Sequence, residues 1–207
     1  MESLEKAARL ILIGCGGHAR SVADVALDAF PGLEIRFVDR AARPGEKIFG
    51  FPVSADWEAA DAALHIALGD NTMRREAFAR HAAHPMVSVI ARSARLGRDC
   101  GVGRGCFLAH GCHLGPLASV GTGTLVNTQA VLDHEVRVGD FCHIGPHATV
   151  SGRTVIGNGV FLGAGSTVID GIRIGDDIVV GAGSTVIGDL LAPGVYVGSP
   201  ARPVRSG

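Results

Sequence analysis

The chain has 207 residues, 47% of them hydrophobic, which is enough material for one or two domains with a buried core. Its formal net charge is -1, so the composition offers no electrostatic basis for binding nucleic acid or an anionic membrane. The acidic start, Met1-Glu2-Ser3-Leu4-Glu5, is wrong for a signal peptide, and no apolar run is long enough to span a membrane. We therefore expect a cytoplasmic protein with neither a nucleic-acid nor a membrane partner.

The first part of the chain has the pattern of a small α/β module. Strands are predicted at 9–15, 33–38 and 63–68, helices at 20–29 and 71–84, and a loop through Gly50-Phe51-Pro52-Val53. About 85 residues precede the next pattern, which is half the size of a full dinucleotide-binding fold. We predict a half-Rossmann domain at 1–86, followed by a second domain at 87–207.

The turn after the first predicted strand, Gly14-Cys15-Gly16-Gly17-His18-Ala19, fits the phosphate-binding pattern G-x-G-x-x-A. Asp39 ends the next strand about twenty residues later, where an acid that binds ribose is expected. Gly69 opens a second strand-end loop, which we expect to lie beside the first. The three features predict a nucleotide site. A close strand-to-helix turn without a ligand is the alternative, and it stays open.

An unbroken repeat of six residues runs from Ile90 to Leu191. An aliphatic residue returns at every sixth position, and a second, usually small residue follows four positions after it. The aliphatic positions are Ile90, Leu96, Val102, Leu108, Leu114, Val120, Val126, Leu132, Val138, Ile144, Val150, Ile156, Leu162, Val168, Ile174, Val180 and Val186. A fixed short repeat of this kind predicts a β-solenoid in which three hexads form one triangular coil.

Four of the five cysteines occupy the small position of a hexad, namely Cys100, Cys106, Cys112 and Cys142. Thiols there pack as small hydrophobic groups, so we favour a structural role over disulfides or a metal cluster.

The motif G-x-G-G-H-A-x-x-V-x-D that begins at Gly14, followed by a hexapeptide solenoid, resembles the hexapeptide-repeat acyltransferases. Within this group, the combination looks like the bacterial nucleotide-sugar N-acetyltransferases of the bacillosamine and perosamine type and the related sialic acid O-acetyltransferases. The resemblance implies an α/β half-Rossmann domain followed by an all-β left-handed parallel β-helix, in a homotrimer that binds acetyl-CoA between neighbouring subunits. It implies that the nucleotide-linked sugar is bound by Gly16, Gly17, His18, Asp39, Arg40 and Gly69.

One hexad contains three consecutive polar residues, Asp133-His134-Glu135, whereas most hexads carry few side chains that could do chemistry. A carboxylate beside an imidazole raises its basicity and fixes its orientation. A solvated histidine on an exposed turn is the alternative. The resemblance implies that His134 is the general base, that Glu135 enhances it and that His143 contacts acetyl-CoA. We predict that Asn127 helps to orient the base.

Three further histidines, His110, His113 and His147, raise the question of a zinc site like that of the γ-type carbonic anhydrases. Two converging ligands on one solenoid would share a face by lying a multiple of eighteen residues apart. No pair of these histidines, with His134 and His143 included, has that spacing. We therefore expect no metal.

Near copies of one hexad, Gly163-Ala164-Gly165-Ser166 and Gly181-Ala182-Gly183-Ser184, lie eighteen residues apart and should stack in successive coils. Small side chains there would leave backbone groups open to the amides of a pantetheine arm. Turns formed simply by Gly and Ala are equally consistent with the pattern. The resemblance implies that Ala164 and Ala182 contact coenzyme A.

Together these features predict an acetyl-CoA-dependent N-acetyltransferase that acts on the amino group of a nucleotide-linked deoxyaminosugar. Acetylation of a hydroxyl on a sialic acid or another sugar is the alternative within this class. A non-catalytic solenoid that binds a nucleotide is the alternative from another class. The sequence does not indicate which nucleobase or which sugar the substrate carries.

Overall fold

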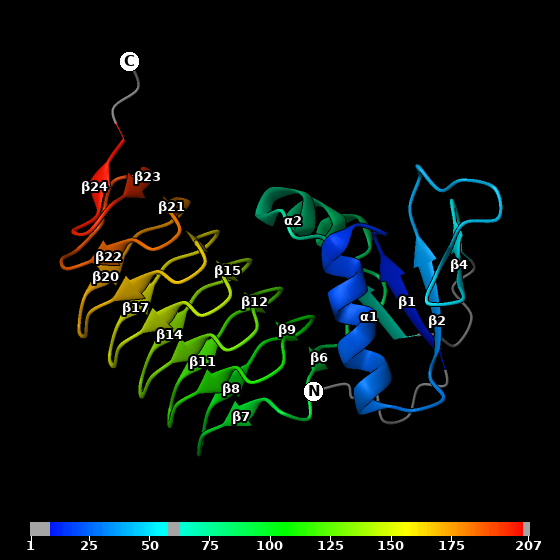
Figure 1. Ribbon diagram of the computed structural model, residues 1–207, viewed down its shortest axis with the longest axis horizontal. Helices are drawn as coiled ribbons and strands as arrows, with labels where there is room; N and C mark the ends of the chain where they lie inside the picture. The colour runs from blue at the N-terminus through cyan, green and yellow to red at the C-terminus, as the bar shows by residue number, and fades with distance from the viewer. Residues whose placement is uncertain (1–8, 58–62, 205–207) are drawn as a thin grey trace.

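The computed structural model describes residues 9–57 and 63–204, and they form an α/β part beside a long solenoid (Figure 1). The acidic first residues, which contribute to the expected cytoplasmic location, lie outside the described residues. None of the described helices is long and apolar enough to cross a membrane.

The α/β part is built on one five-stranded sheet with the order β3-β4-β2-β1-β5. Its strands are β1 (Arg9–Ile13), β2 (Glu34–Val38), β3 (Lys47–Ile48), β4 (Phe51–Ser54) and β5 (Ala63–Ile66). Strands β4, β2, β1 and β5 run parallel, and β3 is antiparallel to β4 at the edge. The three predicted strands are present, each a little shorter than expected.

The loop predicted through Gly50-Phe51-Pro52-Val53 is instead strand β4 of a tight hairpin. Phe49 and Gly50 form the two-residue turn between β3 and β4, and both have positive φ values, 51° and 83°. A two-residue hairpin turn of this twist requires positive φ at both positions. The prediction missed it because Phe49 is an unusual residue for such a turn.

Two helices accompany the sheet, α1 (Gly17–Ala29) and α2 (Asn71–Arg80). Helix α1 starts three residues earlier than predicted, and α2 ends four residues earlier. Helix α1 lies between the sheet and the solenoid (Figure 1), and its buried residues share one core with Phe107 and Leu125 of the solenoid.

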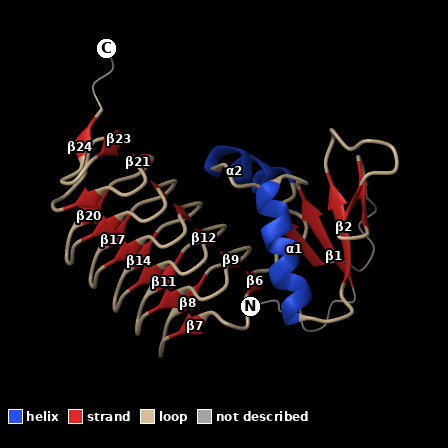
Figure 2. Cartoon of the chain, in the orientation of Figure 1, coloured by secondary structure: helices blue, strands red, loops and turns tan. Residues whose placement is uncertain are grey.

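The solenoid has three faces of short parallel strands, joined by turns at three corners (Figure 2). The first face comprises β6 (Val89–Ile90), β9 (Phe107–Leu108), β12 (Leu125–Val126), β15 (His143–Ile144), β18 (Phe161–Leu162), β21 (Ile178–Val180), β23 (Gly194–Val197) and the antiparallel β24 (Arg202–Pro203). The second face comprises β7 (Arg95–Leu96), β10 (His113–Leu114), β13 (Val131–Leu132), β16 (Thr149–Val150), β19 (Thr167–Val168) and β22 (Thr185–Val186). The third face comprises β8 (Gly101–Val102), β11 (Ser119–Val120), β14 (Arg137–Val138), β17 (Val155–Ile156) and β20 (Arg173–Ile174).

Each corner is named here after the face that precedes it. In one coil the first corner is 127–130, the second 133–136 and the third 139–142. Strands pair with the strand eighteen residues further on, as in His113 with Val131 and Val131 with Thr149. The predicted coil of three hexads is therefore confirmed.

The aliphatic position of the repeat forms the interior of the solenoid. Every such residue from Leu108 to Val186 is buried. Leu96 is 45% exposed because it lies in the first coil, which has no coil beneath it. The six-residue pattern therefore encodes a continuous core that closes only where coils stack on both sides.

The small position of the hexads forms hydrogen bonds inside the third corner. The Cys106 thiol donates to the Gly121 carbonyl (3.0 Å), and the Cys142 thiol donates to the Gly157 carbonyl (3.0 Å). Thr124, between them in the stack, makes the equivalent bond to Gly139 (2.8 Å). Burial raises the pKa of Cys106 to about 11 and of Cys142 to about 12, so these thiols stay protonated and serve as packing groups.

Candidate functional site

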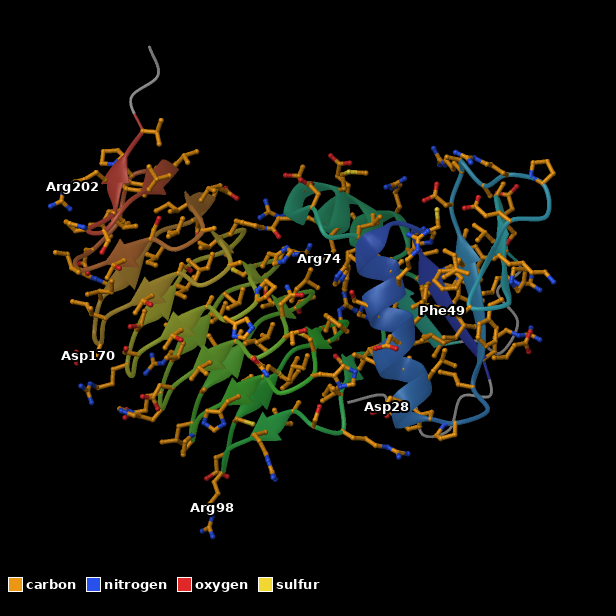
Figure 3. All side chains as sticks on the ribbon, viewed as in Figure 1. Asp28, Phe49, Arg74, Arg98, Asp170 and Arg202 are labelled. Carbon is orange, nitrogen blue, oxygen red and sulfur yellow. The ribbon has the colours of Figure 1, made fainter. Side chains whose placement is uncertain are left out.

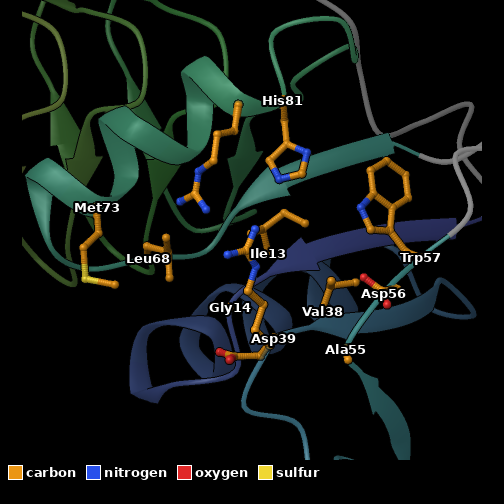
Figure 4. A pocket seen from close by; sticks show the side chains of 12 residues that line it. Ile13, Gly14, Val38, Asp39, Ala55, Asp56, Trp57, Leu68, Met73 and His81 are labelled. Carbon is orange, nitrogen blue, oxygen red and sulfur yellow. The ribbon is translucent and has the colours of Figure 1, made fainter.

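A first cavity of about 440 Å³ opens at the carboxyl end of β1, β2 and β5 (Figure 4). Gly14, Asp39, Arg40, Trp57 and His81 are among the residues that line it. The ends of parallel strands at such an edge are the usual ligand site of doubly wound folds.

Beside this cavity, the glycine loop leads into α1, and no side chain covers the backbone of Gly16 and Gly17. Gly14 has φ +113°, and a side chain there would crowd Leu68 and Ala67, so glycine is required by the turn itself. A Cβ added at Gly16 or Gly17 would meet nothing within 4 Å. Helix α1 has no side-chain cap and no acid in its first turn. Its first N–H groups are therefore available to an anion.

Helix α2 begins differently, because Asp70 caps it. The Asp70 carboxylate accepts a hydrogen bond from the Met73 N–H (2.8 Å). A carboxylate already satisfies this helix end, so a phosphate is favoured at α1 over α2.

Asp39 both faces the first cavity and closes the glycine loop. Its carboxylate accepts from the Cys15 N–H (3.3 Å) and from the Ala41 N–H (2.9 Å). Arg40, next to it, is exposed at the rim. These two predicted residues thus share one cavity with Gly14.

His18, predicted as a sugar contact, lies outside the set of residues that line this cavity. Its ring packs edge-on against Phe107 of the solenoid at 5.1 Å and lies 6.5 Å from the ring of His143. Burial lowers the pKa of His18 to about 3, with nearby His65, His143 and Arg74 adding to the effect. The imidazole is therefore neutral and contributes to the packing of the two parts of the chain.

A second cavity of about 510 Å³ lies between the start of α2 and the first face of the solenoid. It is lined by Gly69, Asp70, Asn71, Thr72, His143, Gly159, Phe161, Asp177 and Val179. Leu68 and Met73 line the first cavity, so the two cavities lie on either side of the first turn of α2. A ligand with two parts could occupy both.

His143 presents a defined edge to this second cavity. Its Nδ1 lies 3.0 Å from the Gly69 carbonyl oxygen, and its Nε2 lies 2.8 Å from Asn127 Nδ2. A carbonyl only accepts, so Nδ1 carries the hydrogen and Nε2 accepts from the Asn127 amide. Burial lowers the pKa of His143, which keeps the ring neutral.

Within one chain the contacts of Asn127 do not reach His134, so its predicted role toward the base stays a prediction. We expected it to orient His134, but its hydrogen bonds go to His143 and to the Ile144 carbonyl. Asn127 stands at a first corner and His134 at a second corner, so the second face separates them.

His134 and Glu135 form a pair at the second corner. Nδ1 of His134 lies 3.3 Å from a Glu135 carboxylate oxygen, and the two side chains are 42% and 48% exposed. The imidazole lies over Gly152 of the next coil, where any side chain would overlap it. The imidazole is therefore held in one orientation and is accessible from solvent, and a general base requires both.

Ala164 and Ala182 lie at the first corner, in the same stack as Thr128 and Pro146. Both alanines are exposed, and the Gly183 N–H donates to the Ala164 carbonyl (2.9 Å) as the coils stack. Within the described ranges, the N–H groups of Ala164 and Ala182 have no hydrogen-bond partner. These donors fit the carbonyl groups of a pantetheine arm.

Sequence analysis missed several residues that line the cavities. Trp57 and His81 form a wall of the first cavity, and Asn71 and Phe161 line the second. Phe161 could have been noticed, because the residue before most aliphatic positions is smaller. Among the described residues, no group of three or more His, Cys, Asp or Glu is placed to hold a metal ion.

Two family models match this chain, one in the α/β part and one in the solenoid. The family model "PglD N-terminal domain" matches residues 9–81, and "Hexapeptide repeat of succinyl-transferase" matches residues 153–187. A His-to-Ala mutant of GDP-perosamine N-acetyltransferase from Caulobacter crescentus, solved with CoA and GDP-perosamine, is 32% identical over 95% of this chain and 97% of its own, with a TM-score of 0.87. The chain belongs to the hexapeptide-repeat nucleotide-sugar N-acetyltransferase family.

A second solved structure is also similar to this chain along its whole length. The acetyltransferase domain of PglB from Neisseria gonorrhoeae, solved with acetyl coenzyme A, is 28% identical over 96% of this chain and all of its own, with a TM-score of 0.90. No curated protein matches the chain by sequence. The comparisons confirm the predicted family and its fold, a half-Rossmann domain followed by a left-handed β-helix.

Proposed function

We propose that this protein transfers the acetyl group of acetyl-CoA to the amino group of a sugar linked to a nucleotide. The observation that carries the proposal is the full-length similarity to an enzyme solved with CoA and GDP-perosamine. The two cavities on either side of the first turn of α2 support the proposal, because a nucleotide sugar also has two parts, a nucleotide and a sugar, and each could occupy one cavity.

In this proposal the nucleotide occupies the first cavity, with Asp39 on the ribose and Arg40 at the rim. The phosphates lie over the uncapped start of α1, at Gly16 and Gly17, where backbone N–H groups are open. The sugar then extends past Gly69 into the second cavity, toward His143 and Phe161. His18 lies against Gly69 and near the ring of His143, so its predicted contact with the nucleotide sugar stays part of the proposal.

In the same proposal, coenzyme A lies along the first corner of the solenoid. The free N–H groups of Ala164 and Ala182 would hold its pantetheine arm. His143 and Asn127 lie further along this side of the solenoid, near the second cavity. When bound, acetyl-CoA supplies the activated acetyl group.

The chemical role of His134 is to take a proton from the acceptor nitrogen. A sugar ammonium is no nucleophile, so the nitrogen must lose a proton to attack the thioester carbonyl. The C–S bond then breaks, CoA leaves as the free thiol after its sulfur takes up a proton, and the amide remains on the sugar. Glu135 orients the imidazole through its Nδ1 (3.3 Å), which leaves Nε2 for the substrate. General base catalysis of this kind contributes about 10²–10⁴ in rate.

We further propose a homotrimer with the site shared between subunits. Within one chain His134 stands at a second corner, whereas Ala164 and Ala182 stand at a first corner. A neighbouring copy that packs against the second face would bring the base of one subunit to the coenzyme groove of the next. One chain alone does not place these groups together.

The test is release of free thiol from acetyl-CoA in the presence of nucleotide sugars that carry an amine or, in matched compounds, a hydroxyl. We expect turnover with an amino sugar. Turnover with the hydroxy sugar alone would move the assignment to O-acetylation. Absence of turnover with binding of both ligands would favour a non-catalytic solenoid.

A further inference from the structure

Arg74 is a cation enclosed by the protein with no anionic partner. Its residue is 0% exposed, and among residues 9–57 and 63–204 no carboxylate forms a salt bridge with it. It lies where α2 meets the solenoid (Figure 3). Burial of a charge is destabilising unless hydrogen bonds compensate for it, so the bonds of this guanidinium explain its position.

Oxygen atoms from both parts of the chain surround the guanidinium. Nε donates to the Gly123 carbonyl (2.7 Å), Nη1 to the carbonyls of Leu68 (3.0 Å) and Gly69 (3.1 Å), and Nη2 to Asn71 Oδ1 (2.7 Å) and the carbonyls of Phe141 and Cys142 (both 3.1 Å). Arg74 thus joins the loop after β5 to two coils of the solenoid.

Two of these bonds organise the wall of the second cavity. The Gly69 carbonyl accepts from Arg74 and also from His143 Nδ1 (3.0 Å). Asn71 accepts from Arg74 through Oδ1, and its Nδ2 donates to the Gly159 carbonyl (2.9 Å). Gly69, Asn71, His143 and Gly159 all line the cavity, whereas Arg74 does not.

We propose that Arg74 is a positioning residue that holds the Gly69 carbonyl in place and thereby keeps His143 in the Nδ1–H tautomer. The catalytic importance of this tautomer rests on the proposed function, but the tautomer itself does not. Gly69 is a glycine in the loop between β5 and α2, where the backbone is conformationally permissive, so these two bonds restrain its carbonyl. Both of its lone pairs are used, one by each side chain.

The tautomer decides what the free edge of His143 can bind. With hydrogen on Nδ1, Nε2 is an acceptor that can receive an N–H from Asn127 or from a ligand. With hydrogen on Nε2, the same atom would donate and would oppose the Asn127 amide. Loss of Arg74 would therefore change the polarity of one cavity wall without removing any group from it.

The first experiment is ¹⁵N NMR of the full-length protein with labelled histidine, with the His143 signal identified by its loss in His143→Gln. We expect a protonated Nδ1 and an unprotonated Nε2. An Nε2–H tautomer in the wild type overturns the proposal directly, without a variant and without any sugar substrate.

The second experiment compares Arg74→Met and Arg74→Lys with Arg75→Met as the matched control. Arg75 follows in the same helix, but it is exposed and its partner is Asp177 (3.4 Å). We expect mixed tautomers and a fall in kcat of about 10²-fold for Arg74→Met, a smaller fall for Arg74→Lys, and wild-type behaviour for Arg75→Met.

Wild-type tautomer and wild-type kcat in Arg74→Met would refute the positioning role. If Arg74→Met fails to fold, Arg74→Lys and the wild-type spectrum decide. A Lys variant with unchanged tautomer and activity would also refute it. Because the tautomer is measured without the acceptor, a failed acetyltransferase assay would count against the proposed function alone.

Discussion

At the scale of single residues, His134 owes its position to its neighbours on the corner. Glu135 holds one ring nitrogen, and Gly152 of the next coil leaves space for the ring. The chemistry assigned to His134 therefore depends on a carboxylate one residue away and on the absence of a side chain eighteen residues away.

We predict that His134→Asn lowers kcat by about 10²–10⁴ at neutral pH, because the acceptor amine loses its base. If the acceptor is an amine, activity should partly recover as pH rises, since free amine accumulates. A hydroxyl acceptor would give no such recovery. The measurement is the pH–rate profile of the variant, and full activity would remove His134 from the mechanism.

Gly152→Ala should lower kcat by about 10²-fold, because a methyl group would displace the His134 ring from its orientation. Binding of acetyl-CoA, measured by calorimetry, should stay unchanged. Gly188→Ala is the matched control: Gly188 occupies the equivalent position two coils on, where an added Cβ meets nothing within 4 Å. An equal effect of both substitutions would contradict the steric explanation.

At the scale of elements, the start of α1 and the end of β2 form one unit. Asp39 accepts from the Cys15 N–H, so the carboxylate that faces the first cavity also shapes the glycine loop. This unit and the proposed coenzyme groove belong to different parts of the chain, so the two should respond to substitution separately.

Asp39→Ala should weaken binding of the nucleotide sugar and leave acetyl-CoA binding unchanged. Titration calorimetry with each ligand measures this. Asp39→Asn is the milder comparison: its single amide oxygen can keep the bond from the Ala41 N–H or from the Cys15 N–H but not both, so we expect a smaller loss of nucleotide-sugar binding than in Asp39→Ala. Equal loss of both ligands in Asp39→Ala would mean that the α/β part had unfolded, and no loss of either would return the loop to a simple turn.

The junction between α/β part and solenoid should be sensitive to acid. Burial lowers the pKa of His18 to about 3 and of His65 to about 4, whereas the unfolded value is about 6.5. The unfolded chain therefore binds protons first. The free energy of unfolding should be unaffected by these groups above about pH 6.5 and should fall below it, by up to about 1.4 kcal/mol per pH unit for each group.

Urea unfolding between about pH 7.5 and about pH 5.5 measures this dependence. His18→Gln should make the dependence less steep but not abolish it, since one buried imidazole is gone while His65 and His143, whose pKa values burial also lowers, remain. His113→Gln, on the second face, should leave it unchanged. A wild-type protein equally stable at both ends of the range would show that the junction does not carry the expected proton linkage.

At the scale of the whole molecule, the proposed site requires the second corner of one subunit to lie against the first corner of another. A solenoid exposes all three faces unless something covers them, and the described residues of the α/β part pack on the first face, against Phe107 and Leu125. Closed cyclic symmetry would place the second corner of each subunit against its neighbour.

A mixing experiment tests the shared site. His134→Ala removes the base, and Ala164→Trp should block the groove, so each homotrimer should be inactive. If base and groove come from neighbouring subunits, co-expression in equal amounts should restore about a quarter of wild-type activity, because each site draws its two halves independently. No restoration would place both halves in one subunit, and light scattering that shows an active monomer would exclude the trimer.

The sequence by itself determined the repeat, the coil and the corner on which each polar residue stands, because a six-residue period is local and every coil repeats it. It also located the glycine loop and Asp39 at one edge of a sheet. Only the tertiary structure decided that Phe49 and Gly50 turn a hairpin, that Asn127 pairs with His143, and that Arg74 and His18 lie at the junction. These contacts depend on how two differently patterned parts pack together, and no period in the chain records which side chains meet across that boundary.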